Sequence, residues 1–357
     1  MLKKVLSVLL CAVMVCSLAA CSSSTKNSSV LQNNAIYNEN GYFKNIKATD
    51  YFDVCDLSNV EISQSEIDEQ IQKILNSYPD SVQVTDRAVA DKDTVNIDYV
   101  GYFGDEAFDG GSTNGKGTNV VIGSTQYIDD FIDQLIEHKP GETFDVMVTF
   151  PEEYEPNPAY AGKDAKFVVT INYIQEFVDA TWNDAFVEKN FKDSLLISTT
   201  AEAEEIIKGD LAFNKIYMDS KSLQDVPEML VNWQLDKMVE YYTAVAASYG
   251  VTLDDYLKAI QIESVDKLRE QNKQACLNTA KQYLFMQAVA EKLGYVPTEE
   301  DENAYFDFLQ QTDPDFTKDS YLEVYGSNYV RAIVMYDYLE KHILDHVDLT
   351  VVEKPAE

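Results

Sequence analysis

Residues 94–174 constrain the fold of this chain more than any other stretch. Hydrophobic and polar residues alternate there in three segments, around residues 95–99, 144–150 and 167–171. A period of two, carried by β-branched and aromatic side chains, is typical of strands that bury one face. The three segments therefore predict an antiparallel sheet with one side turned towards a core.

One short helix is predicted between the first two of these strands. Residues 128–138 repeat with helical spacing. The apolar positions on one face of this run are Ile128, Phe131, Ile132, Leu135 and Ile136. Pro140 and Gly141 come next, as is common just past the end of a helix. A curved antiparallel sheet wrapped on one short helix is the simplest architecture for this stretch.

The pattern changes to helices after Thr181. Gly250 and Gly294 are placed to end two of them as C-cap glycines, and Thr298 and Thr317 are placed as N-caps. The predicted helices cover residues 201–220, 227–249, 264–293, 299–311, 318–325 and 329–346. The predicted fold class is therefore α+β, with a sheet domain followed by an all-α domain.

A series of motifs in the sheet region carries a resemblance to a known family. IDYVG, FDGG, VVIGS, FIDQLIEHKPGE, VTFPEEY and AGKDAKF follow one another in this order. They resemble the FKBP-type peptidyl-prolyl isomerase domain, in the version found in the trigger factor family. The helical half is similar to the C-terminal domain of that family in order and length. The resemblance implies an FKBP-like isomerase domain over residues 89–177 and a helical chaperone domain over residues 178–357.

The implied reaction is rotation about a peptide bond that precedes proline. Amide resonance opposes this rotation with a barrier of about 18–20 kcal/mol. No proton or covalent bond has to move, so a catalyst only has to hold the twisted amide better than the planar one. Because the twisted amide is less polar, an apolar pocket that strips water from it favours the rotation. We therefore expect an aromatic cup, with no cofactor and no metal.

The resemblance places this cup on named positions. The residues that match the family pattern are Tyr99, Phe108, Asp109, Tyr127, Ile128, Phe131 and Phe167. Phe131 matches the floor of the pocket, and the backbone amide of Ile128 matches the donor to a substrate carbonyl. Tyr160 and Val121 are further candidates for contact with substrate. Plain core packing is the alternative for each aromatic residue, since a pocket floor and a core residue look alike in a sequence.

One departure from the family pattern lies at the expected rim of this pocket. Asp129 and Asp130 stand where the family usually has Pro-Gly. Two carboxylates there would weaken substrate binding or shift the preference towards basic clients. The alternative is that they are favourable charges at the start of a helix, where the helix dipole stabilises acidic side chains. The departure leaves open a non-catalytic holdase chaperone that uses this domain as a peptide clamp.

Residues 1–20 have the pattern of a bacterial lipoprotein signal peptide. Lys3 and Lys4 precede an apolar run, and small residues stand directly before Cys21. The run is shorter than the ~20 residues that a membrane-spanning helix needs, which disfavours that alternative. Cleavage before Cys21 and lipidation of its thiol would supply two acyl chains, enough for stable anchoring. We expect a lipid-anchored protein on the extracytoplasmic face of the cell membrane.

Two segments separate this signal from the sheet domain. Residues 21–49 are rich in Ser and Asn and predict a flexible tether. Residues 50–88 predict a strand–helix connector, with Ser63 and Glu66 spaced as a capping box. In the trigger factor family a ribosome-binding domain comes before such a connector. Only the signal and the tether precede it here, so we expect no ribosome docking.

Charge and composition limit the classes of partner that this chain can bind. The formal net charge is -33, which repels the phosphates of nucleic acid. No nucleic-acid partner is therefore expected, and the implied partners are unfolded or nascent exported polypeptides. A solute-binding lipoprotein is a less favoured alternative, because that fold needs repeated βαβ units.

Cys55 and Cys276 are far apart in the sequence, a pattern more typical of thiols than of a disulfide.

Overall fold

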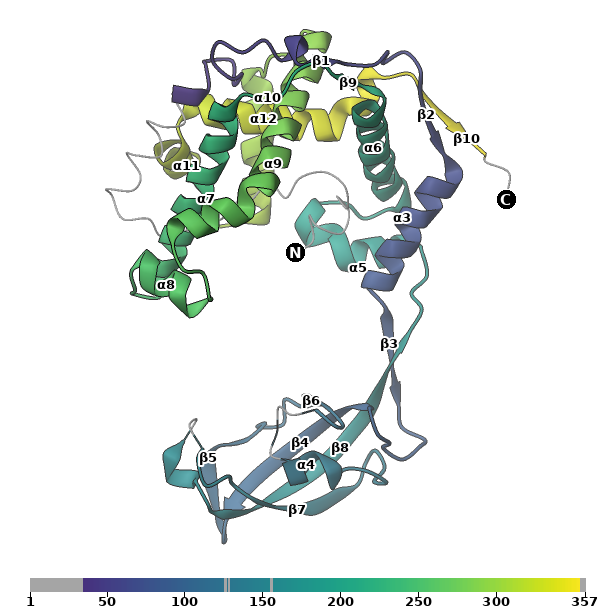
Figure 1. The fold of residues 1–357 in the computed structure, drawn as a ribbon. Helices are drawn as coiled ribbons and strands as arrows, with labels where there is room; N and C mark the ends of the chain where they lie inside the picture. The colour runs from purple at the N-terminus through teal and green to yellow at the C-terminus, as the bar shows by residue number, and fades with distance from the viewer. Residues whose placement is uncertain (1–34, 125–126, 128, 155–156, 354–357) are drawn as a thin grey trace. The chain divides into compact units, whose positions relative to one another are not determined.

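Figure 1 shows the computed structural model, which describes residues 35–124, 127, 129–154 and 157–353. The chain forms two compact units. The sheet unit is Leu75–Thr181, and the helical unit combines the residues up to Ile74 with those from Trp182 onward. The predicted α+β fold, with an antiparallel sheet domain and a helical C-terminal region, is confirmed.

The sheet unit is built on a six-stranded antiparallel sheet. Its strands are β3 (Asp80–Val84), β4 (Thr94–Phe103), β5 (Glu106–Ser112), β6 (Thr118–Val121), β7 (Thr143–Thr149) and β8 (Asp164–Val178). β8 pairs with β3, β4 and β7, while β4 also pairs with β5 and β6. Alternating side chains of β4, β7 and β8 fill one core, which includes Val95, Ile97, Val146, Val148, Val169 and Ile171.

The helix of this unit is shorter than predicted. α4 covers Asp129–Asp133, and residues 134–138 continue as turns. The Leu135 N–H donates to a carbonyl three residues earlier, and Glu137 has a φ of 70°. A residue with positive φ cannot continue a right-handed helix. The predicted apolar face nonetheless turns into the core, where it buries Phe131, Ile132 and Leu135.

The predicted connector, residues 50–88, is divided between the two units. Its helix α3 (Gln64–Ser77) begins at the predicted capping box. The Ser63 N–H donates to Glu66 Oε2 at 2.7 Å, and the Glu66 N–H donates to Ser63 Oγ at 3.3 Å. The strand that follows, β3, pairs with β8 and is therefore an edge of the sheet rather than part of a linker.

Helices of very different length make up the helical unit after the sheet. They are α5 (Asp184–Leu195), α6 (Thr200–Asp219), α7 (Glu228–Ser248), α8 (Leu253–Ala259), α9 (Val265–Leu293), α10 (Glu299–Thr312), α11 (Lys318–Tyr325) and α12 (Ser327–His342), followed by the 3-10 helix Ile343–His346. The predicted helices are confirmed to within a few residues at each end. α5 and α8 were not predicted, because short helices offer too few turns for a periodic pattern.

Two short strand pairs add to this unit, which was predicted as all-α. β1 (Phe52–Asp53) pairs antiparallel with β9 (Lys221–Ser222). β2 (Val60–Ser63) pairs parallel with β10 (Leu349–Val352). Both pairs join the segment before the sheet unit to residues that follow it. The helical unit is therefore built from two stretches of sequence, one before the sheet unit and one after it.

Residues 35–49, predicted as part of the flexible tether, pack into the core of the helical unit instead. Tyr37 and Phe43 form an isolated antiparallel β-bridge, and their rings stack with centroids 4.8 Å apart. Both rings are buried, together with Ala48. The prediction was wrong because the Asn and Gly residues of this segment form a tight turn between two aromatic anchors.

Buried polar groups of α9 hold this segment in place. Gln287 is fully buried, and its side chain accepts from the Phe43 N–H (2.7 Å) and donates to the Ile46 carbonyl (2.9 Å). Glu291, one turn later, accepts from the N–H groups of Ala48 (2.8 Å) and Thr49 (2.9 Å). A buried polar group without its partner costs about 1–3 kcal/mol. The segment is therefore an integral part of the helical unit.

Among the described residues, no helix combines the length and the apolar character needed to cross a bilayer. Cys276 is buried and Cys55 is partly exposed, and both are free thiols, as the sequence indicated.

Replacing Gly41 with alanine should destabilise the helical unit. Gly41 has a φ of +77°, and a Cβ there would lie 2.5 Å from the backbone nitrogen of Ala332 in α12. Gly250 is the matched control, because its φ is +71° and no described atom lies within 4 Å of its Cβ position. Left-handed strain alone costs about 1–2 kcal/mol. Gly41→Ala should cost about 1–3 kcal/mol more than Gly250→Ala, from overpacking.

Urea unfolding followed by circular dichroism measures both free energies of unfolding. Equal losses in the two variants would contradict the close packing of this segment against α12.

Candidate functional site

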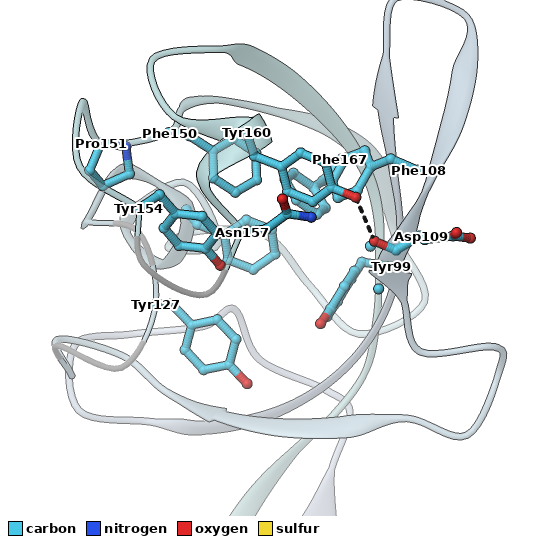
Figure 2. Close-up of a pocket in the computed structure, with 13 residues that line it drawn as sticks. Tyr99, Phe108, Asp109, Tyr127, Phe150, Pro151, Tyr154, Asn157, Tyr160 and Phe167 are labelled. Atoms are coloured by element: carbon cyan, nitrogen blue, oxygen red, sulfur yellow. Dashed lines mark hydrogen bonds between the residues drawn. The ribbon is translucent and has the colours of Figure 1, made fainter.

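The sheet unit contains an open pocket (Figure 2). Its volume is about 590 Å³, which falls in the ~300–1,000 Å³ range of small-ligand sites. The lining residues are Tyr99, Phe108, Asp109, Gly110, Gly111, Tyr127, Phe131, Phe150, Pro151, Tyr154, Asn157, Tyr160 and Phe167. Aromatic rings dominate this lining, so the pocket favours an apolar group.

Three rings from three elements form the floor. Phe131 comes from α4, Tyr99 from β4 and Phe167 from β8. They meet edge to face, with centroid distances of 5.1 Å for Phe131–Phe167, 5.6 Å for Tyr99–Phe167 and 5.8 Å for Tyr99–Phe131. Ring quadrupoles favour this geometry. Phe131 and Phe167 are 4% and 7% exposed, so these two rings belong to the core and also line the pocket.

Tyrosine hydroxyls supply much of the polar part of the lining, beside Asp109 and Asn157. Tyr127 stacks on Phe131 with centroids 6.0 Å apart, and Tyr154 packs on Phe150 at 5.0 Å. Burial raises the pKa of Tyr99, and the nearby Tyr127 and Tyr154 raise it further. Tyr99 therefore keeps its proton at neutral pH, and its hydroxyl is an uncharged donor.

Phe108 forms one wall of the pocket and depends on two glycines. Its ring lies 5.7 Å from that of Phe167, centroid to centroid. A Cβ on Gly101 would lie 2.6 Å from the Phe108 ring, and a Cβ on Gly111 would lie 2.5 Å from it. Larger residues at these two positions would displace the ring. The glycines of the IDYVG and FDGG motifs therefore make room for the wall.

Asp109 contributes its main chain to the pocket. In Figure 2 its carboxyl group points away from the aromatic rings. Its carbonyl oxygen accepts a hydrogen bond of 3.0 Å from Tyr160 Oη. Tyr160 thus lines the pocket as predicted, and it links the loop before β8 to β5. Asp109 is among the lining residues, and its carbonyl rather than its carboxyl group makes this contact.

Val121 was predicted near the substrate and lies elsewhere. It is 45% exposed on β6 and is not among the lining residues, whereas its neighbour Val120 is buried in the core. Strand alternation places the two side chains on opposite faces of the sheet. Ile128 and Cys21 lie outside the described residues, as do the side chains of Asp129 and Asp130.

The part of the lining that lies between β7 and β8 was not predicted. These residues are Phe150, Pro151, Tyr154 and Asn157. Asn157 accepts from the Ala159 N–H (3.1 Å) and so starts the short 3-10 helix Pro158–Tyr160. The VTFPEEY motif was the available signal, because it contains the first three of these residues. It carried the family resemblance but no periodicity that would place its side chains.

The arrangement suits binding and desolvation. Its rings can exclude water from an amide, and its hydroxyls can donate to a carbonyl. Across the part of the chain that the structure describes, no group of three His, Cys, Asp or Glu side chains is placed to hold a metal ion. Two histidines near the C-terminal end of the described residues contact other side chains: His342 Nδ1 lies 3.1 Å from Asp345 Oδ2, and His346 Nε2 lies 3.1 Å from Tyr338 Oη.

Two protein families match separate parts of the chain. Residues 85–172 match the family described as FKBP-type peptidyl-prolyl cis-trans isomerase. Residues 219–347 match the family described as bacterial trigger factor protein C-terminus. The first range holds the pocket, and the second covers most of the helical unit.

Curated relatives of this chain are also trigger factors. The trigger factor of Halothermothrix orenii is 32% identical over 252 residues, which cover 68% of this chain and 58% of the relative. That of Staphylococcus saprophyticus is 34% identical over 245 residues, or 65% of this chain and 55% of the relative. The chain thus spans less than two thirds of the length of these relatives.

A solved structure described as "Promiscuous Substrate Recognition in Folding and Assembly Activities of the Trigger Factor Chaperone" aligns over 82% of this chain and 72% of that chain. The identity is 15% and the TM-score 0.30, so this likeness carries no argument about the fold. The family matches and the relatives carry it instead. On their strength, the chain is a trigger factor-like protein with an FKBP-type domain and a trigger factor C-terminal domain.

Proposed function

We propose that this protein catalyses cis–trans isomerisation of peptide bonds before proline in polypeptide clients. The observation that carries the proposal is the aromatic pocket, in which the floor rings Phe131 and Phe167 are buried while the space above them is open to a ligand. A pyrrolidine ring is a small apolar group and fits such a space. The supporting family match covers the whole of this pocket.

In this proposal the pocket acts by desolvation. The proline ring rests on Phe131 and against Tyr99 and Phe167, and the rings displace water from the amide that precedes it. Rotation removes amide resonance and makes the bond less polar, so the dry pocket favours the twisted form over the planar form. The neutral Tyr99 hydroxyl can donate to a client carbonyl and fix its orientation. No lining residue has to accept or release a proton.

Phe131→Ala should lower kcat/KM for a proline-containing peptide by about tenfold or more, because burial against a Phe side chain contributes ~1.5–3 kcal/mol. Phe144→Ala is the matched control. Phe144 packs against the same core and stacks on His138, but it is not among the lining residues. Its loss should lower the melting temperature and leave kcat/KM close to the wild-type value.

Val121→Ala provides a second control at an exposed position outside the pocket. A protease-coupled proline isomerisation assay measures all three variants. If the wild type gives no rate above background on several peptides, the catalytic proposal is lost and a peptide clamp is favoured. If Phe144→Ala slows the reaction as much as Phe131→Ala, the pocket is not its site.

We also propose that the helical unit binds unfolded polypeptides. Its surface carries exposed apolar side chains on several elements, including Tyr249 (72% exposed) and Met218 (69% exposed). Met and Tyr side chains adapt to varied apolar segments. The trigger factor relatives support binding of unfolded chains. Client capture therefore belongs to the helical unit and isomerisation to the sheet unit.

Tyr249→Ser combined with Met218→Ser should weaken suppression of the aggregation of a chemically unfolded test protein several-fold. Gln271→Ser, an exposed polar position on α9, should have no effect. Phe131→Ala should also leave the suppression intact, since its pocket serves the isomerase reaction. Light scattering during dilution from denaturant measures this. Undiminished suppression in the double variant would contradict the assignment of these side chains to client binding.

We further propose that Cys21 carries a lipid anchor and that the protein acts on exported chains at the extracytoplasmic face of the membrane. The support is the signal-like sequence of residues 1–20 followed by Cys21. The net charge of -33 opposes contact with ribosomal RNA, so the proposal includes no ribosome docking.

Cys21→Ser should move the protein from the membrane fraction to the soluble fraction and abolish incorporation of labelled palmitate. Cys55→Ser serves as the control, because it removes a free thiol that carries no lipid in this proposal. Fractionation and labelling of cells that express each variant measure the effect. Equal membrane association of the wild type and Cys21→Ser would reject the anchor.

A further inference from the structure

The pocket wall that carries Phe108 is a bulge in the sheet. β5 pairs with β4 at Ala107 opposite Tyr102 and again at Ser112 opposite Val100. Residues 108–111 therefore stand opposite the single residue Gly101. All of these bulge residues line the pocket. Because a bulge interrupts the regular ladder, other contacts have to fix its position.

Two of the supports of this bulge are already clear. Its first end is held by the ladder pair at Ala107. Its middle is held by Tyr160 Oη, which donates to the Asp109 carbonyl at 3.0 Å. At its second end, the ladder pair between Ser112 and Val100 is followed directly by Thr113.

Thr113 pins this second end to the floor of the pocket. Its N–H donates to the carbonyl of Tyr99 at 3.1 Å. Its Oγ1 accepts from the N–H of Tyr99 at 3.2 Å. The residue that follows the bulge strand is therefore bonded to both main-chain polar groups of a floor residue. Any shift of Thr113 would move the wall relative to the Tyr99 ring.

Asp98 fixes Thr113 from the other face of the sheet. Asp98 precedes Tyr99 in β4, so strand alternation turns its side chain away from the pocket. Its Oδ1 accepts from Thr113 Oγ1 (2.5 Å) and from the Gly117 N–H (2.9 Å). Its Oδ2 accepts from Asn172 Nδ2 (2.9 Å), which anchors the group to β8. Both carboxylate oxygens are thus engaged.

Asp98 remains charged under ordinary conditions. The Thr113 hydroxyl lowers its pKa most, followed by the Asn172 amide and the Gly117 N–H. Bonds to a charged acceptor are roughly twice as strong as bonds between neutral groups. The contact between Asp98 and Thr113 is therefore well suited to holding a strand end whose ladder is interrupted.

We propose that Asp98 and Thr113 are positioning residues for the isomerase pocket, holding the end of the bulge so that Phe108 stays against the floor. Neither residue is among those that line the pocket. They act through Tyr99 and through the bulge residues. This inference rests on the proposed isomerase function. Under it, residues on the outer face of the sheet contribute to that function.

Two substitutions of Thr113 separate its hydroxyl from its shape. Thr113→Val removes the hydroxyl and keeps the branched outline, whereas Thr113→Ser keeps the hydroxyl. Thr113→Val should lower kcat/KM by about tenfold to a hundredfold, the loss expected when a binding group moves by about 1 Å. Thr113→Ser should retain most of the wild-type rate.

Thr143→Val is the matched control on the same sheet. Thr143 Oγ1 shares a hydrogen bond of 2.8 Å with Thr170 Oγ1 between β7 and β8, and neither residue lines the pocket. The same hydroxyl-to-methyl change there should leave kcat/KM unchanged. A loss equal to that of Thr113→Val would mean that the reaction only senses the general stability of the sheet, and it would overturn the proposal.

Hydrogen exchange gives a readout that does not depend on activity. Amides of residues 107–112 should exchange faster in Thr113→Val than in the wild type, Thr113→Ser or Thr143→Val, as mass spectrometry of the full chain can measure. Unchanged exchange in Thr113→Val would overturn the positioning role. An inactive wild type would reject the isomerase function, and the exchange data would still decide whether Thr113 holds the bulge.

Discussion

The sheet unit depends on aromatic rings that support one another from their edges and still leave a space between them. Protein cores normally close such a space, because an unfilled volume forfeits dispersion contacts. Here Phe131, Phe167 and Tyr99 meet edge to face at 5.1–5.8 Å, which stabilises each ring from the side. Gly101 and Gly111 leave the Phe108 ring the room that a Cβ would take. The pocket is therefore a consequence of core packing, and its floor is as rigid as the core.

Periodicity predicted the elements that are long enough to repeat their apolar positions several times. α9 spans Val265–Leu293 and was predicted almost to the residue, and the alternating runs of β4, β7 and β8 were equally clear. The segment 35–49 was not predictable in this way. Phe43 bonds to Gln287, which lies 244 positions along the chain, and no local pattern records such a partner. A segment rich in Asn therefore reads as a tether even when it completes a core.

The family resemblance placed the predicted site residues, and periodicity supports that placement only on regular elements. Tyr99, Phe131 and Phe167 lie on regular elements, where position along the chain decides which way a side chain points. Phe150, Tyr154 and Asn157 lie at the end of β7 or on the loop that follows, and hydrogen bonds rather than a period set the course of that loop. The prediction for Val121 was wrong because a step of one residue moves a strand side chain to the opposite face of the sheet. In the bulge this alternation is interrupted, and Asp109 accepts from Tyr160 through its main-chain carbonyl.

The two proposed activities place different demands on a client, and each demand explains the need for the other unit. Uncatalysed rotation before proline takes tens to hundreds of seconds, so a client has to stay bound long enough for the bond to be presented. A pocket of this size grips only a few residues and cannot supply much affinity by itself. Exposed apolar side chains such as Tyr249 and Met218 can hold a longer segment without a fixed sequence. Because both units belong to one chain, a client held by one stays attached to the chain that carries the other. A weak but rigid pocket is then sufficient for catalysis.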